Sequence, residues 1–246
     1  MIESDFSVGD SAMMRIAIRS GRIDVEAGET GLVQVTVDTR DRTFEVRQRG
    51  DTIVASGKRG DRAHVTVRVP PTTDIDASTT SGDVNVISPV RHLDVVSASG
   101  NVFFDAVERL QTRSSSGSIR GDTVAGEARC ETASGDIRIA QILERGDLAT
   151  ASGNIAVDLC AGTISCSTVS GNVRLNVVTG PSVTIKSTSG LARIGIPSGT
   201  RLDLDANTFS GRVTLPAPNP HPEPAEREIT ARVRLVSGDL RIDRVD

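Results

Sequence analysis

Serine and threonine are the residues of this chain whose regular spacing could support nucleophilic catalysis. A serine or threonine stands three residues before the glycine of a recurring Ser-Gly pair in eight of nine copies. These hydroxyl residues are Thr79, Ser97, Ser114, Thr132, Thr150, Thr168, Ser187 and Thr208. A hydroxyl nucleophile needs a base beside it, normally a histidine oriented by a carboxylate. No histidine or acid recurs there, so we interpret this hydroxyl column as structural and predict no catalytic residue and no enzyme.

Metal and redox chemistry have equally little support. The histidines are His64, His92 and His221, and the cysteines are Cys130, Cys160 and Cys166. Their spacing matches no zinc motif, and three cysteines do not make a disulfide framework. Asp or Asn follows six of the nine glycines, but one such residue per repeat supplies too few oxygens for calcium. We predict free buried thiols, no metal ion and no cofactor.

A stripe of arginines is the candidate interaction surface. These arginines stand three residues after the glycine and are Arg120, Arg138, Arg174 and Arg193. Acidic residues follow two positions later on the same face, as in Asp122 and Asp158. Alternating charges of this kind are typical of a solvated, ion-paired surface. If the stripe does bind, an acidic protein surface or a polyanion is the fitting partner.

Composition narrows the classes of function. The chain of 246 residues has 23 Gly, five Phe, no Trp and no Tyr, and its net charge is −4. Platforms for single-stranded nucleic acid and most sugar-binding clefts use aromatic side chains, and nucleic acid attracts basic surfaces. A polysaccharide lyase would need acids and a basic residue clustered in a groove, which no motif shows. We expect no nucleic-acid binding.

The start of the chain and its apolar segments bear on location. The first twenty residues lack a basic segment followed by an apolar one, and no apolar run approaches the length of a membrane span. We therefore expect a cytoplasmic protein without a membrane span.

The elements that must position these side chains are strands of a repeat about 18 residues long. The repeat glycines are Gly82, Gly100, Gly117, Gly135, Gly153, Gly171, Gly190, Gly211 and Gly238. Apolar residues alternate before each glycine, and the alternation restarts two residues after it, as at Val173 and Leu175. Alternation predicts strands, and the break in phase predicts a corner at the glycine, where Gly and Asx tolerate left-handed backbone. Units this short bury their apolar side only by stacking on one another. We predict an all-β, single-stranded β-solenoid that resembles a parallel β-helix.

The remaining segments depart from this regularity. Residues 1–74 read as short strands, and we expect them to form an irregular N-terminal β cap and a first rung, followed by regular rungs over 75–215. Residues 216–230 are rich in proline and predict an excursion from the sheet, and 231–246 form a closing rung. The four segments are expected to make one domain. Charges around Arg244 in the closing rung predict an end guarded against strand addition.

The repeat pattern resembles that of a known protein family. The iterated T-x-S-G-[DN]-[VI] pattern, preceded by a V-x-V-P-P stretch from Val67 to Pro71, is similar to the bacterial β-solenoids of unknown function that carry the name "putative adhesin". The resemblance covers nearly the whole chain and implies the β-solenoid fold. It implies no catalytic residues, and it links some members to cell-envelope stress.

Our prediction of function is a non-enzymatic interaction or scaffolding module. A protein partner is expected, with the chain itself a monomer or a weak oligomer. Two alternatives stay open, namely an adhesin-like binder of glycans or surface polymers and a self-assembling scaffold.

Overall fold

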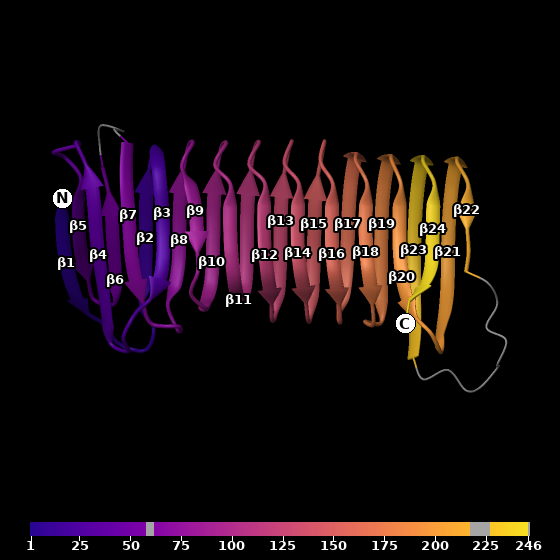
Figure 1. Cartoon of the computed structure of the whole chain (residues 1–246), viewed down its shortest axis with the longest axis horizontal. Coiled ribbons are helices and arrows are strands. Elements are labelled where there is room, and N and C mark those ends of the chain that lie inside the picture. Colours follow the sequence, from indigo (N-terminus) through magenta and orange to yellow (C-terminus); the bar gives the residue numbers. More distant parts are fainter. Residues whose placement is uncertain (58–61, 217–226, 246) are drawn as a thin grey trace. The chain divides into compact units, whose positions relative to one another are not determined.

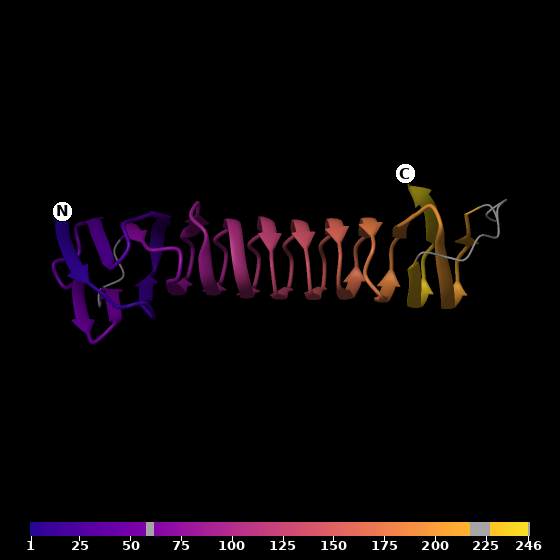
Figure 2. The ribbon, with the colours of Figure 1, turned by 90° about the horizontal axis from the view of Figure 1, so that it is seen from below.

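The computed structural model describes residues 1–57, 62–216 and 227–245. Within these ranges the chain is built from strands and contains no helix, which confirms the predicted all-β class (Figure 1). It divides into two compact units, Met1–Asp122 and Thr123–Asp246. The strand β12 (Ile119–Val124) crosses the boundary between them. Within each unit the strands lie in two layers joined by corners (Figure 2).

The first unit contains eleven strands besides the start of β12. They are β1 (Ile2–Ser7), β2 (Met13–Ile18), β3 (Ser20–Ala27), β4 (Leu32–Thr39), β5 (Glu45–Arg49), β6 (Thr52–Ser56), β7 (Arg62–Val69), β8 (Asp74–Thr79), β9 (Asp83–Val86), β10 (Val90–Ser97) and β11 (Val102–Ser114). One layer has the order β5–β6–β2–β8–β10–β11 and the other β1–β4–β7–β3–β9–β11. The pairs of β1, β4 and β5 are antiparallel and the others are parallel. The antiparallel strands β1, β4 and β5 therefore lie at the end of the parallel rungs in these two layers.

The described residues of the second unit form twelve strands. They are β13 (Glu127–Thr132), β14 (Ile137–Ile142), β15 (Arg145–Thr150), β16 (Ile155–Cys160), β17 (Thr163–Ser170), β18 (Val173–Val178), β19 (Ser182–Ser189), β20 (Ala192–Pro197), β21 (Thr200–Ser210), β22 (Val213–Thr214), β23 (Arg227–Ser237) and β24 (Leu240–Val245). All pairs between them are parallel. One layer has the order β13–β15–β17–β19–β23–β21 and the other β14–β16–β18–β20–β24–β22, which confirms the β-solenoid.

The order of rungs in space differs from their order in the sequence. The last rung of the chain, β23–β24, lies between β19–β20 and β21–β22 (Figure 1). In the first unit, β2–β3 likewise lies between β6–β7 and β8–β9. The prediction that a charged closing rung guards the end was therefore wrong, because that rung is interior. Arg244 donates hydrogen bonds to the carbonyls of Pro197 (3.1 Å) and Thr200 (2.7 Å) instead.

The predicted C-terminal bound of the proline-rich excursion was wrong. We predicted it over 216–230, but β23 already begins at Arg227. The residues 217–226 lie outside the described part of the chain.

The core consists of stacked columns of small apolar side chains. Leu148 lies between Cys130 and Cys166 in one such column, and each of the three is at most 2% exposed. Burying a valine, leucine or isoleucine contributes about 1.5–3 kcal/mol, so stacking supplies the stability that a single rung lacks. Phe104 fits this narrow interior because Gly121 leaves room for it: a Cβ on Gly121 would lie 1.9 Å from the Phe104 ring.

Candidate functional site

The hydroxyl column is bonded to the backbone near the corners at every member except Thr168, whose buried hydroxyl has no hydrogen-bond partner among the described residues. The hydroxyl of Ser97 accepts a hydrogen bond from the Gly100 N–H at 2.8 Å and donates one to the Gly100 carbonyl at 3.1 Å. Thr79 accepts from the Gly82 N–H at 2.7 Å, and Thr132 from the Gly135 N–H at 3.1 Å. These buried hydroxyls satisfy backbone groups that burial would otherwise leave unpaired. The structural interpretation of the column is confirmed at these corners.

The corner glycines are required mainly by close stacking. A Cβ on Gly100 would lie 1.8 Å from the carbonyl oxygen of Gly82, and one on Gly171 would lie 1.9 Å from that of Gly153. Of the repeat glycines, only Gly190 (φ of +135°) and Gly211 (φ of +159°) have a positive φ. No described residue other than glycine has a positive φ. Our explanation by left-handed Gly and Asx was therefore wrong at most corners, because the adjacent rung occupies the space of a side chain.

The Asp and Asn residues after the glycines form a second hydrogen-bonded column. Each side-chain oxygen accepts the backbone N–H of the equivalent residue in the next rung, as from Asn154 to Asp136 (2.9 Å) and from Asn172 to Asn154 (3.0 Å). The backbone hydrogen bond from Asn154 lowers the pKa of Asp136, and Arg138 adds to this, although partial burial opposes it. We name this column the Asx ladder, and its role is to satisfy exposed corner N–H groups.

The Asx ladder gives a testable difference between two variants. Asn172→Ala removes the acceptor of the Leu191 N–H, which is 2.9 Å away, and is expected to cost about 1 kcal/mol of unfolding free energy. Asn172→Asp keeps the acceptor and should stay near wild type at pH 7. Its new carboxylate should have a pKa that is lower in the folded than in the unfolded state, as that of Asp136 is. Asn172→Asp should therefore have a higher unfolding free energy than Asn172→Ala above about pH 4, and this difference should shrink as the pH falls. Urea unfolding at several pH values measures this, and equal stabilities at pH 7 would count against the ladder.

The structure brings only part of the arginine stripe together. Arg174 and Arg193 are register neighbours, and Arg193 is followed by Arg241. Arg138 is separated from Arg174 by Ala156 on the intervening strand. Arg120 belongs to the first unit and the other three belong to the second.

Acids neutralise much of this stripe. Arg138 pairs with Asp136 at 2.8 Å, and Asp243 accepts from both Arg193 and Arg241 at 2.8 Å. The hydrogen bond from Arg241, together with Arg193, holds the pKa of Asp243 below its ordinary value. This geometry favours the ion-paired interpretation, and a binding role for the stripe stays a prediction.

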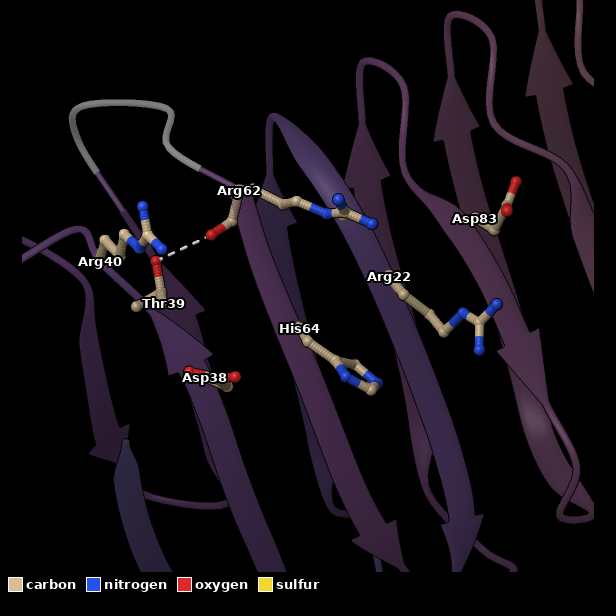
Figure 3. A pocket seen from close by; sticks show the side chains of 8 residues that line it. Arg22, Asp38, Thr39, Arg40, Arg62, His64 and Asp83 are labelled. Atoms are coloured by element: carbon tan, nitrogen blue, oxygen red, sulfur yellow. Dashed lines mark hydrogen bonds between the residues drawn. The ribbon is translucent and has the colours of Figure 1, made fainter.

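A hollow in the first unit is the strongest candidate site, and we did not predict it from the sequence. It has a volume of about 890 Å³ and is lined by Gly21, Arg22, Asp38, Thr39, Arg40, Arg62, His64 and Asp83 (Figure 3). Strands β4, β7, β3 and β9 place these residues side by side. Asp38 is in register with His64, His64 with Arg22, and Arg22 with Asp83. We call this site the arginine hollow.

The arginine hollow combines three guanidinium groups with two acids. Within the described ranges, no carboxylate lies within ion-pair distance of Arg22, Arg40 or Arg62. His64 is bonded through Nε2 to Asp24 at 2.5 Å, just beside the hollow. Arginine binds carboxylates in a planar, two-pronged geometry, so the hollow can hold an acidic group from a partner. One signal in the sequence was available: Arg22 follows Gly21 at the position that holds Asp or Asn in most later copies.

In the described residues of the second unit, one end of the stack has no strand beyond it. Leu202, Leu204 and Ala206 of β21 point inward but are only half-buried, whereas their register partners in β23 are at most 1% exposed. Phe209 is 91% exposed and Leu215 is 55% exposed. In the described part of the chain, β21 pairs on one side only, with β23. This unpaired side of β21 is called the β21 edge below.

The cysteines are free and buried, as predicted. Burial raises the pKa of Cys160 to about 11 and raises the pKa of Cys130 and Cys166 further. Only the thiolate reacts with disulfide reagents. We therefore expect almost no labelling of the native protein at pH 8 and three labelled thiols after denaturation, measured with a chromogenic disulfide. Labelling of even one thiol at full stoichiometry in the native state would contradict this packing.

Two kinds of feature are absent from the described residues. No group of three or more His, Cys, Asp or Glu residues is arranged there to hold a metal ion. No helix in the described ranges is long and apolar enough to cross a membrane.

Comparison with known proteins supports the fold. The model of one protein family, described as Toastrack DUF4097, matches residues 9–243. A search of curated proteins finds no match to the sequence.

Solved structures show only a distant similarity. A "putative lipid binding protein" from Parabacteroides distasonis is 12% identical, with a TM-score of 0.45 over 100% of this chain and 96% of that chain. A "putative adhesin" from Bacteroides fragilis is 12% identical, with a TM-score of 0.40 over 99% and 96%. Another, from Parabacteroides merdae, is 13% identical, with a TM-score of 0.39 over 100% and 96%. These similarities are too low to indicate a function.

Proposed function

Because the chain belongs to the Toastrack DUF4097 family, we propose that it is a non-enzymatic β-solenoid that works as a protein-interaction module. The observation that carries this proposal is the arginine hollow. Its three guanidinium groups are gathered in one hollow and lack acidic partners among the described residues, whereas Arg138, Arg145 and Arg193 each pair with a nearby acid. Unneutralised arginines are enriched in surfaces that bind proteins.

The mixed charges of the arginine hollow favour a protein partner over a uniform polyanion. Asp38 and Asp83 lie at the two ends of the row that contains His64 and Arg22. A phosphate backbone would bring negative charge against both acids, whereas a protein segment can place a carboxylate on Arg22 and basic side chains beside the acids. The net charge of −4 also disfavours nucleic acid. The partner is therefore a protein segment with an acidic residue flanked by basic ones.

We extend the proposal to a cytoplasmic location. The three free thiols support it, because the chain uses no disulfide to stabilise a fold of small side chains. A surface location with exposure on intact cells would contradict it.

The experiment compares two charge reversals in affinity capture from native cytosol. Arg22→Glu with Arg62→Glu alters the arginine hollow, and Arg15→Glu with Arg109→Glu makes the same change in net charge on the other layer. We expect a protein retained by wild type and by the control variant to be lost from the hollow variant. Its bound segment, mapped by cross-linking, should contain an acidic residue.

Three outcomes would overturn the proposal. Retention of the same proteins by the hollow variant would remove the arginine hollow as the binding site. Retention of glycan in place of protein would favour the adhesin-like alternative. Turnover of any bound polymer would contradict the non-enzymatic assignment. A separate observation, the β21 edge, favours self-association of the chain.

A further inference from the structure

The β21 edge is an unusually complete strand edge. β21 is eleven residues long and contains no proline and no lysine, and its inward positions carry no charge. Natural edge strands are normally shortened, charged inward, interrupted by proline or covered, because their free N–H and C=O groups pair readily with another strand. In the first unit, the parallel strands β6 and β7 are covered at the end of the stack by the antiparallel strands β5 and β4, and β1 pairs with β4. Among the described residues, the β21 edge has none of these devices, and its charged residues Arg201, Asp203 and Asp205 all lie at the outward positions.

The apolar side chains at this edge are also incompletely covered. Leu202 and Leu204 are half-buried, and Phe209 on β21 and Val236 on β23 are exposed. Covering the inward column would complete the core as β23 does for β19. A strand added to the β21 edge would therefore gain backbone hydrogen bonds and apolar contacts together.

We propose that the β21 edge pairs with the same edge of a second copy of this chain, antiparallel and about a two-fold axis at Asp205. This inference is independent of the arginine hollow. An isologous contact of this kind closes on itself and gives a dimer, not a filament. All eleven residues of β21 take part only when the axis lies at Asp205, the central residue of the strand.

Side-chain pairing across this axis is complementary. Residues opposite each other lie on the same face of an antiparallel pair. The inward residues Leu204 and Leu202 face Ala206 and Thr208 of the second copy, so the apolar column is covered. Outward, Arg201 faces Phe209 of the second copy, which is a cation–π pair, and Asp203 faces Asn207. No pair buries a charge in the core.

The one like-charge contact is at the axis, where Asp205 faces its own copy. Arg234 neutralises this carboxylate in each protomer, since its Nη1 donates to Oδ1 at 2.9 Å and its Nη2 donates to Oδ2 at 2.5 Å. A shift of the axis to Leu204 would place Asp203 against Asp205 twice, which is unfavourable. The pairing about Asp205 is therefore the favoured register.

The test measures the dimer dissociation constant by sedimentation equilibrium. We expect a concentration-dependent dimer for wild type. Asn207→Asp should weaken it by between about twofold and thirtyfold, because each new carboxylate then faces Asp203 of the other copy, once on either side of the axis. Combining Asn207→Asp with Asp203→Lys should restore affinity, since only the proposed register places these two positions opposite each other. Gln141→Glu, an exposed change of equal charge on β14, is the control and should leave the constant unchanged.

Three other outcomes would overturn the proposed dimer. All three variants carry substitutions at exposed positions, so folding is retained and circular dichroism verifies it. A wild-type protein that stays monomeric at the highest soluble concentration overturns the proposal. So does an Asn207→Asp variant that dimerises as wild type does, or a series of species larger than the dimer, which would indicate head-to-tail stacking.

Discussion

Replacing Gly171 by alanine is expected to destabilise the protein by roughly 3 kcal/mol or more of unfolding free energy. The reason is contact between two backbones: the new Cβ would lie 1.9 Å from the carbonyl oxygen of Gly153 and 2.8 Å from its carbonyl carbon. A flexible side chain could move aside, but this corner is held by backbone hydrogen bonds to both adjacent rungs and by the Asx ladder at Asn172, so it cannot. Urea unfolding followed by far-ultraviolet circular dichroism measures the change.

Gly50→Ala separates this effect from backbone strain. Gly50 has φ of +60°, which alanine adopts at a cost of about 1–2 kcal/mol, but nothing lies within 4 Å of its Cβ position. It should therefore be the milder substitution of the two. If Gly171→Ala costs no more than Gly50→Ala, close stacking is not what requires glycine at the corners.

The second large effect concerns the order of the rungs. Ile229→Ala is expected to cost about 2–5 kcal/mol of unfolding free energy, because Ile229 is fully buried between β19 and β21. The register partner of Ile229 is Leu202, which is half-buried at the end of the stack. Leu202→Ala should therefore lower the unfolding free energy by less than half as much as Ile229→Ala. Thermal and urea unfolding of the two variants give the comparison.

Which of the two variants, Ile229→Ala or Leu202→Ala, is less stable distinguishes the observed order of rungs from stacking in sequence order. If rungs stacked in sequence order, β21 would be interior and β23 would be the end rung, so Leu202→Ala would be the more costly variant. Ile142→Ala serves as a control in an undisputed interior rung, because Ile142 is fully buried on β14. Its cost should match that of Ile229→Ala.

The fold could be predicted because residues of the same type occupy equivalent positions in nearly every copy of the repeat. Alternating apolar residues before and after each glycine indicate two strands, and the constant spacing aligns equivalent residues, as at Cys130, Leu148 and Cys166. Those three positions lie in one column as expected. The hydroxyl column was also readable, because a serine or threonine at a fixed place beside a corner has few buried partners except the backbone.

The reason for glycine at the corners was not readable from the sequence. A glycine at a turn ordinarily indicates left-handed backbone. At Gly100 and Gly171 the cause is instead the distance to the adjacent rung, which no local pattern encodes. The same holds for Asn172, whose side chain serves the next rung and not its own turn.

The candidate sites depend on long-range order that the sequence leaves open. The arginine hollow exists because β7 and β4 pair beside β3, which places His64 next to Arg22 although 42 residues separate them (64 − 22). The β21 edge exists because the chain returns to insert β23 ahead of it. A repeat of nearly identical rungs stacks in either order, so only the structure reveals which rung is last.

Backbone amide hydrogen exchange across β21 and β23 is the most direct test of this account. At low protein concentration, where the protein is monomeric, amides of β23 should exchange slowly, because this strand is paired on both sides. Amides of β21 should exchange faster, and at high concentration they should become protected as the dimer forms, while β23 stays unchanged. Fast exchange throughout β23, or protection of β21 equal to that of β23 at low concentration, would contradict the rung order and the β21 edge together.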